Sequence, residues 1–410
     1  MDSRRNFVGK VAYGLAGTLA AGPARVLGAN DRIRIGIIGA GDRGMELVNH
    51  IRACSNTEIA GFADVYAKRL ETAAAIAPGA SIHRDYRSLL DDPAVDAVIV
   101  ATPQHLHAQQ FCDAIAAGKH VYLEKAMALS VSQAKQMRAV YEADRRRHVV
   151  QIGHQACSTG HVTDVRQFLA RPDRMGGDRL GKITAIGMQM HRNTPVNKPQ
   201  WARPALLTPD MTPDRLDWSE FLGDAPPREF DANRFVHWRY FWDYSGGSVF
   251  EHMSQQLSFW YGTLNLDIPQ SATMKGGIYL WKDGRQVPDT VSVTLQQPEE
   301  ILVSWVSGFG NNQLGVTEDV LGTHGSIARA SQVRYVPQKV NRPDLQEAVG
   351  RTAHIPQAHL QNFLDCIRLG GEPNCPLELG YRVSIACRMA VDSYREGRTV
   401  RWDAQREEIV

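Results

Sequence analysis

Cysteine is scarce in this sequence of 410 residues: there are six, and no two of them form a C-x-x-C pair or a spacing typical of metal ligands. The six are Cys54, Cys112, Cys157, Cys366, Cys375 and Cys387. We therefore expect small buried side chains and no metal site. An excess of one charge is also missing, because 46 Lys and Arg residues face 44 Asp and Glu residues. A net charge of +2 gives no support for nucleic acid or an anionic membrane as a partner.

Long apolar runs, internal repeats and low-complexity linkers are missing too. No run reaches the roughly 18 apolar residues that are needed to cross a bilayer. The rest of the composition, 43% hydrophobic and 22% charged, is typical of a soluble globular protein. The length suits two domains with full cores.

The N-terminus carries an export pattern. Residues 3–7 read Ser-Arg-Arg-Asn-Phe and are followed by Lys10, which resembles the twin-arginine motif. A mild apolar stretch, residues 11–21, and small residues at 22–24 come next. The alternative is an amphipathic or disordered tail of a cytoplasmic protein. We expect residues 1–30 to be a signal for the twin-arginine translocase and the protein to be periplasmic or otherwise exported.

Residues 31–152 alternate short β-rich runs with helical segments. The runs "RIRIGIIG", "TEIAGFAD", "VDAVIVAT", "KHVYLEK" and "HVVQIG" are separated by helices that we expect to begin at Arg43, Ala67, His107 and Ser130. Such alternation indicates βαβ units and a parallel sheet. The runs "IGIIG" and "AVIVA" are apolar at every position, as strands buried on both faces should be.

Residues 153–403 have a different texture, and we expect a second α/β domain. The runs "GKITAIGMQMH", "QSATMKGGIYLW", "DTVSVTLQQ", "EILVSWVSGF" and "GSIARA" alternate with period 2, which predicts an open, mostly antiparallel sheet. We expect helices at 162–170, for about 15 residues after "FWDYSGG", at 354–369 and at 380–396. The Pro- and Trp-rich residues 193–245 are expected to form an ordered loop wall.

A glycine-rich turn follows the first strand. In Gly39-Ala40-Gly41-Asp42-Arg43-Gly44 the first glycine permits a tight turn, the second lets the backbone approach a pyrophosphate, and the third lets the helix pack closely. Asp64 ends the second strand 20 residues after Gly44, where a carboxylate binds the ribose hydroxyls. The pattern predicts a doubly wound Rossmann domain that binds NAD. Lys68 and Arg69 keep NADP as the alternative.

Polar side chains follow the next two core strands. Thr102, His105 and His107 come after "AVIVA", and Glu124 and Lys125 end "KHVYLEK". Ligands of open α/β sheets bind at these strand ends, so we expect all five to bind the cofactor, with His105 and His107 beside its nicotinamide half. For the histidines the alternative is a helix-capping or surface role. They have no third ligand at a suitable spacing, so we expect no zinc.

From Arg32 to about Asp403 the sequence resembles the Gfo/Idh/MocA family, the relatives of glucose-fructose oxidoreductase and inositol dehydrogenase. The E-K-P motif of that family reads Glu124-Lys125-Ala126 here. The resemblance implies that Lys125 lies between nicotinamide and the substrate hydroxyl, where its charge favours the alkoxide. It also implies association into a homo-oligomer.

A second family motif, G-G-x-x-x-D-x-x-x-H-x-x-D, reads "GGSVFEHMSQQLS" here, with Glu251, Gln255 and Ser258 in place of Asp, His and Asp. The three positions share one helical face. Glutamine cannot take a proton from a hydroxyl. The base is therefore Glu251 or the adjacent His252, or it is Lys125, or the chain binds a cofactor without this chemistry.

Several polar and aromatic residues are candidates for the substrate pocket: His154, Gln155, His191, Arg192, Trp238, Arg239, Tyr240 and Tyr244. Aromatic faces stack on the C–H faces of sugars and the polar groups bind hydroxyls, so the mixture suits a carbohydrate or polyol. The alternative is a set of core aromatics with satisfied polar groups.

These observations favour an exported NAD(P)-dependent oxidoreductase that acts on a hydroxyl of a sugar, glycoside or cyclitol. Because free NAD is scarce outside the cytoplasm, we expect a tightly held cofactor that is regenerated in place. The alternatives are a redox-neutral NAD-dependent glycosidase and a non-catalytic sugar-binding or sensing protein that retains NAD.

Overall fold

Six parallel strands form the first sheet of the computed structural model, which describes residues 32–170 and 179–410. Their order is β3-β2-β1-β4-β5-β6. The bounds are β1 Ile33–Ile38, β2 Thr57–Ala63, β3 Ser81–His83, β4 Ala97–Val100, β5 His120–Leu123 and β6 Val150–Ile152. This order confirms the predicted doubly wound sheet, and it places the switch point between the carboxyl ends of β1 and β4. The expected export signal, residues 1–30, lies outside the described residues.

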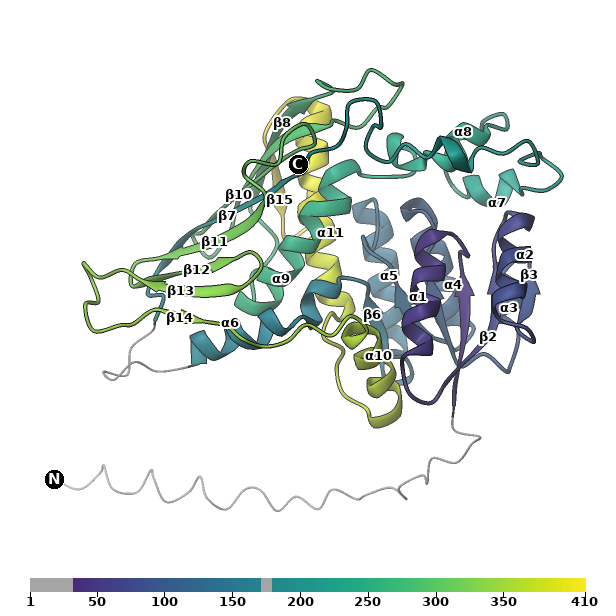
Figure 1. Cartoon of the computed structure of the whole chain (residues 1–410), viewed down its shortest axis with the longest axis horizontal. Helices are drawn as coiled ribbons and strands as arrows, with labels where there is room; N and C mark the ends of the chain where they lie inside the picture. The colour runs from purple at the N-terminus through teal and green to yellow at the C-terminus, as the bar shows by residue number, and fades with distance from the viewer. Residues whose placement is uncertain (1–31, 171–178) are drawn as a thin grey trace, which may run out of the picture. The chain divides into compact units, whose positions relative to one another are not determined.

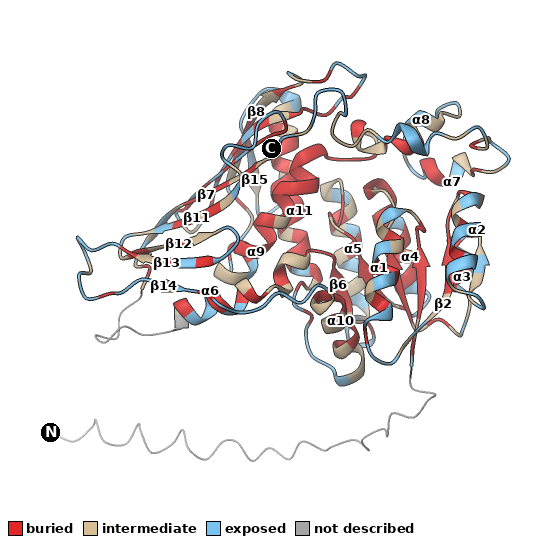
Figure 2. Cartoon of the chain, in the orientation of Figure 1, coloured by how far each residue is buried: buried red, intermediate tan, exposed pale blue. Residues whose placement is uncertain are grey.

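Helices cover both faces of this sheet, which is why its strands are apolar at nearly every position. Ile35, Ile37 and Ile99 pack toward α1 (Asp42–Arg52) and α10 (Ala358–Leu369). Alternate residues such as Val98 pack toward α3 (Tyr86–Leu90), α4 (His107–Ala116) and α5 (Val131–Ala143). Figure 2 shows the central strands of this sheet as mostly buried: β1, β4, β5 and β6 are buried at all but two positions, whereas the edge strand β3 has no buried residue. The remaining helix of the domain, α2 (Ala67–Ile76), begins where the sequence predicts.

The second sheet has ten strands in the order β14-β13-β12-β11-β7-β10-β9-β8-β15-β16. They are β7 Ile183–His191, β8 Ser271–Gly277, β9 Thr290–Gln296, β10 Leu302–Gly308, β11 Val316–Gly322, β12 Gly325–Arg329, β13 Val333–Pro337, β14 Ala348–Val349, β15 Val400–Asp403 and β16 Glu408–Ile409. Only the pair β7 and β10 is parallel among these described strands, so the expected mostly antiparallel sheet is confirmed.

One face of the second sheet packs on α9 (Ser254–Leu264) and α11 (Leu377–Glu396) (Figure 1). Helix α6 (Gly160–Ala170) packs on α9 and β13. Helices α10 and α11 begin at other residues than expected, four residues later and three earlier. Pro356 precedes Gln357, the N-cap of α10, and disfavours a helical conformation for the residue before it; Pro376 is itself the N-cap of α11, with extended backbone. In the described chain no helix is long and apolar enough to cross a membrane.

Residues 201–240, which we call the covering segment, contain short helices in place of a plain loop. These are η4 (Pro204–Leu206), α7 (Trp218–Leu222), α8 (Ala232–Val236) and η5 (Trp238–Tyr240). The segment docks on the loop after β2: Ala67 N–H donates to Arg215 O at 2.9 Å, and Asp217 N–H donates to Val65 O at 2.9 Å. Figure 1 shows α7 and α8 beyond the ends of α2 and α3. The covering segment therefore lies at the carboxyl edge of the first sheet.

Candidate active site

The glycine turn after β1 forms a cradle that fits a dinucleotide. Gly39 has a φ of +96°, and a Cβ there would lie 2.9 Å from the backbone of Ala101. A Cβ on Gly44 would lie 1.9 Å from Gly39 O, so helix α1 can pack here only without a side chain. Gly41 differs, because its missing Cβ would meet nothing closer than the Arg69 guanidinium at 3.5 Å. Open space at Gly41 and the N-terminus of α1 beside it are what a pyrophosphate needs.

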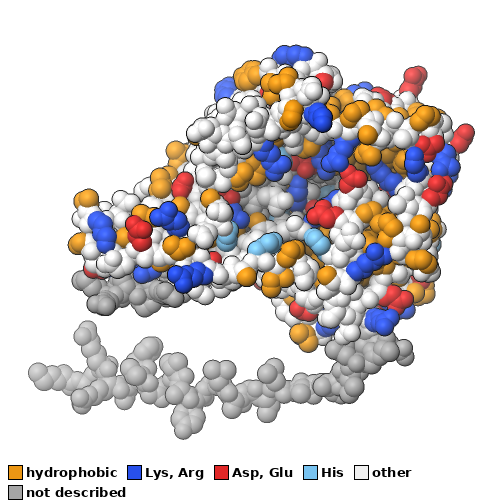
Figure 3. Space-filling view, viewed as in Figure 1, with side chains coloured by type: hydrophobic (Ala, Val, Ile, Leu, Met, Phe, Trp, Pro, Cys, Tyr) orange, Lys and Arg blue, Asp and Glu red, His pale blue; other side chains and the backbone are white. Residues whose placement is uncertain are grey.

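A cavity of about 380 Å³ extends from this cradle into the space between the domains. That volume is within the range of small-molecule sites. Predicted site residues make up much of its lining: Gly39, Gly41, Asp42, Arg43, Asp64, Thr102, Glu124, Lys125, Gln155, Trp238, Arg239, Glu251 and Gln255. Figure 3 shows a hollow in this face of the molecule with Lys and Arg side chains around it.

Asp64 holds the cradle in shape from the end of β2. Its Oδ2 accepts the Ala40 N–H at 2.8 Å and its Oδ1 accepts the Tyr66 N–H at 2.9 Å. Arg69 Nη1 lies 3.6 Å from Oδ2. A carboxylate has about four acceptor positions, so capacity remains for ribose hydroxyls.

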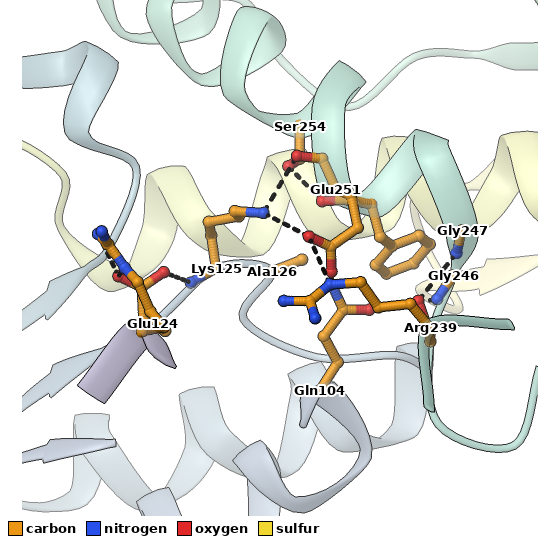
Figure 4. A network of polar contacts seen from close by, with 12 residues as sticks. Gln104, Glu124, Lys125, Ala126, Arg239, Gly246, Gly247, Glu251 and Ser254 are labelled. Atoms are coloured by element: carbon orange, nitrogen blue, oxygen red, sulfur yellow. Dashed lines mark hydrogen bonds and ion pairs between the residues drawn. The ribbon is translucent and has the colours of Figure 1, made fainter. Parts of the chain in front are cut away.

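At the other end of the cavity, Glu251 lies at the centre of a polar network (Figure 4). Lys125 Nζ lies 3.0 Å from Glu251 Oε2 and also donates to Glu251 O at 3.1 Å. Gln104 Nε2 donates to Oε1 at 2.8 Å, and Arg239 Nε lies 3.3 Å from Oε2. The network joins four elements: the end of β5, η1 (Gln104–Leu106), η5 and the π-helical turn Val249–Met253.

These contacts keep the Glu251 carboxylate ionised. Burial alone would raise its pKa, but the charges of Lys125 and Arg239 outweigh burial and lower the pKa to about 2. A carboxylate held in this way is a weak proton acceptor by itself. Its effect is to fix the Lys125 ammonium group at the end of the cavity.

Glu124, the neighbour of Lys125, ties β5 to the glycine turn. Its Oε1 accepts Arg43 Nε at 2.7 Å, and its Oε2 accepts the Lys125 N–H at 3.1 Å. The peptide bond between Lys125 and Ala126 is cis. The cofactor cradle and the proposed catalytic lysine are thus linked through one buried carboxylate.

The two histidines after β4 lie outside the lining of this cavity. His105 Nε2 lies 2.7 Å from Phe221 O. The ring nitrogens of His107 lie 2.8 Å from Ala126 O and 3.0 Å from Thr102 O. Both side chains are buried, and they join the strand end to the covering segment and to the Lys125 turn.

Seven other candidate residues also lie outside the lining: Gly44, His154, His191, Arg192, Tyr240, Tyr244 and His252. His154 and Tyr244 have no exposed surface, whereas Arg192 is exposed. His252 is buried and stacks on Trp201 at 5.9 Å between ring centroids. Ser258, the last of the three positions of the second family motif, is buried and donates to Gln255 O. The other two, Glu251 and Gln255, line the cavity.

Sequence reasoning missed several residues of the site. Gln104 lies between the candidates Thr102 and His105 and was not singled out, yet its Nε2 donates to Glu251 Oε1 at 2.8 Å and its Oε1 accepts the Gly246 N–H at 3.2 Å. The covering segment adds further lining residues: Arg203, Leu206, Phe221, Phe235 and Val236. The only signal for them was the aromatic composition of residues 193–245.

Comparisons with known proteins agree with this geometry. Residues 33–154 match the model of an oxidoreductase family with an NAD-binding Rossmann fold. Inositol 2-dehydrogenase of Acidothermus cellulolyticus is 24% identical over 385 residues, which is 91% of this chain and 96% of that protein. The uncharacterized oxidoreductase YrbE of Bacillus subtilis is 31% identical over 156 residues, 38% of this chain and 44% of that protein.

Two solved structures show the same fold along nearly the whole chain. Aldose-aldose oxidoreductase of Caulobacter crescentus, complexed with glycerol, has a TM-score of 0.66 at 19% identity, covering 90% of this chain and 99% of that one. The WlbA dehydrogenase of Bordetella pertussis, in complex with NADH and UDP-GlcNAcA, has a TM-score of 0.65 at 19% identity, covering 91% of this chain and 99% of that one.

Proposed function

We propose that the chain is an oxidoreductase of the Gfo/Idh/MocA family, and that it oxidises a hydroxyl group of a sugar, glycoside or cyclitol with NAD as the hydride acceptor. One observation carries the proposal: a single cavity has the glycine cradle at one end and the Lys125–Glu251 pair at the other. The names of relatives, inositol 2-dehydrogenase among them, support a polyol substrate.

Lys125 is the residue that we propose to touch the reacting oxygen. An ammonium group has three N–H donors, and two of them are directed to Glu251. The third is left for a substrate oxygen in the cavity, where the positive charge stabilises the developing alkoxide. The nicotinamide, when bound, supplies the acceptor for the hydride.

The proton of the substrate hydroxyl also needs an acceptor. Gln255 faces the cavity but cannot accept a proton, and Glu251 alone is a weak base. We infer a relay: the hydroxyl proton passes to Lys125 Nζ as an ammonium proton passes over 3.0 Å to Glu251 Oε2. The charge of Lys125 is then unchanged, and Glu251, which holds a proton only weakly, releases it to solvent.

The covering segment supports the retention of the cofactor. Arg203 Nη1 lies 2.7 Å from Asp42 Oδ2, directly at the N-terminus of α1. Phe221, Phe235 and Val236 complete the cavity opposite the cradle. A dinucleotide bound under these side chains would leave only after the contacts with the segment break, which favours a cofactor that stays through many turnovers.

Turnover on a matched panel tests the function. Purified protein with added NAD is mixed with inositols, aldoses and glycosides, and reduction is followed by nicotinamide absorbance together with product analysis. We expect reduction with at least one polyol, and with NAD rather than NADP, because Asp64 repels a 2′-phosphate. Binding of polyols without any reduction or product would contradict the proposal and favour a binding protein, as Gln255 in place of the family histidine would suggest.

Two further proposals concern the surroundings of the protein. Export rests on residues 3–10 and on no described residue. Self-association is supported by Leu302 and Leu321, exposed side chains that flank Ala185 on the outer face of the second sheet. The export proposal is checked by fractionation of cells that express either the parent chain or Arg4→Lys/Arg5→Lys. The self-association proposal is checked by light scattering of the purified protein. Unchanged export or a monomer would contradict the respective proposal.

A further inference from the structure

Positive charge is in excess at the substrate end of the cavity. Lys125 and Arg239 line this end together with one anion, Glu251. At the cradle end, in contrast, acidic lining residues pair with arginines: Asp42 with Arg203, Asp64 with Arg69, and Glu124 with Arg43. The excess at Lys125 is therefore local, and oxidised nicotinamide, itself a cation, would add to it.

Arg239 is held in place but keeps most of its donors free. Its guanidinium lies 4.1 Å from the centre of the Trp238 ring, and its Nε faces Glu251 at 3.3 Å. Its two terminal nitrogens have no hydrogen-bond partner among the described residues. A guanidinium fixed on one side and open on the other presents two parallel donors to a carboxylate.

Arg192 is a further cation near this end, although it lies outside the lining of the cavity: its backbone N–H donates to Gly308 O at 3.0 Å, next to Phe309. It follows β7, it is exposed, and within residues 32–170 and 179–410 its guanidinium makes no ion pair. The pKa of His252 is lowered to about 3. Burial is the largest cause, the charge of Arg192 is the next, and the charge of Lys125 follows. The pKa of His252 is therefore lowered by three cations: Arg192, Lys125 and Arg239.

His252 is itself a buried polar group without a partner. It is 9% exposed, and its Nε2 has no hydrogen bond in the described part of the chain. Its ring is fixed by Trp201 and by Phe309, whose centroid lies 5.8 Å away. Unpaired buried polar groups are costly, so they commonly mark a place where a ligand completes the bonding.

We propose that the substrate carries a carboxylate, as a uronic acid or carboxylated cyclitol does, and that Arg239 binds this group beside Lys125. The proposal rests on the proposed function for the reaction and adds the substrate class. A monoanion offsets the excess of positive charge that Lys125 and Arg239 have over Glu251, and the planar donors of arginine match a carboxylate. A neutral sugar would leave this excess, and the two terminal nitrogens of Arg239, without an anionic partner.

The test uses two probes that differ only in charge, glucuronate and glucuronamide, with glucose 6-phosphate as the competing anion. Calorimetry on the NAD-loaded protein measures binding, and nicotinamide absorbance measures turnover. We expect the parent chain to bind glucuronate roughly tenfold or more tightly than the amide. The ratio of the two affinities should fall toward one in Arg239→Gln, and it should persist in Arg401→Gln, where an exposed arginine is lost from β15.

Equal affinity for acid and amide, preference for the phosphate, absence of glucuronate binding, or a ratio that survives in Arg239→Gln would overturn the proposal. The two hypotheses fail differently. Arginine-dependent binding of glucuronate without any turnover would support the carboxylate site and contradict the redox function. Turnover of neutral sugars with no preference for the acid would support the redox function and contradict the carboxylate site.

Discussion

Replacing Lys125 by methionine is expected to lower kcat by about 10²- to 10³-fold, the effect of removing one donor that stabilises a developing oxyanion. Methionine keeps much of the length and apolar character of the side chain but has no charge and no N–H donor. Glu251 would keep Gln104 and Arg239 as partners, so the fold around it should persist. The measurement is kcat with the best polyol from the panel, with the amount of bound NAD determined on the same sample.

Two matched variants separate the chemistry from general damage. Lys125→Arg keeps the charge and should retain more activity than the methionine variant. Lys275→Met removes an exposed lysine of β8 and should leave kcat unchanged. If Lys125→Met binds NAD and turns over like the parent chain, Lys125 does not act on the reacting oxygen, and the relay through Glu251 fails with it.

Acidification from about pH 6.5 to about pH 5 is expected to lower the free energy of unfolding by several kcal/mol. Burial lowers the pKa of His105 and His359 to about 4 and, with the charge of Lys125, that of His154 to about 3. In the unfolded chain the same groups titrate near pH 6.5, so over this window the unfolded state binds protons that the folded state does not. Stability is full above the window and is lost as the pH falls, by roughly 1.5 kcal/mol per histidine and on the order of 5 kcal/mol for the three.

Chemical denaturation at a series of pH values measures this slope. His154→Leu should flatten it, because both ring nitrogens of His154 lack a hydrogen-bond partner among the described residues and leucine removes one titrating group. The comparison variant, His354→Gln, changes an imidazole that is exposed and solvated in either state, so the slope should stay. A free energy of unfolding that does not change across the window would mean that these histidines are hydrated or paired in solution.

The first domain could be predicted from sequence because its physical requirements are local. A strand buried on both faces must be apolar throughout, and a turn such as Gly39–Gly44 admits no Cβ at the close contacts. The second sheet was only half predicted. Strand β11 was missed since its sequence places Glu318 and Asp319 side by side, and Glu318 is buried through an ion pair with Arg329. A buried charge whose partner is on the neighbouring strand breaks the alternation on which strand prediction depends.

The candidate site, like the fold, could be predicted from the sequence only in part. The position of a strand end could be predicted, but not the direction of the side chains that follow it. Gln104 and His105 are neighbours, yet Gln104 binds Glu251 and His105 turns to Phe221 in the covering segment. The contact of Lys125 with Glu251 joins residues 126 positions apart, which no local pattern encodes. The resemblance to a family singled out both residues, and the structure brings them together.

The measurement that tests the central claim most directly is the dinucleotide content of the purified protein. The chain is denatured with acid, and nicotinamide dinucleotide in the supernatant is counted per chain. Gly41→Ala is the matched control, because a Cβ there meets Arg69 at an ordinary contact distance of 3.5 Å but takes up space that the pyrophosphate needs. We expect close to one equivalent from the parent chain and almost none from the folded variant. A parent chain that contains no dinucleotide and binds none when NAD is added would contradict both the resident cofactor and the oxidoreductase site built around it.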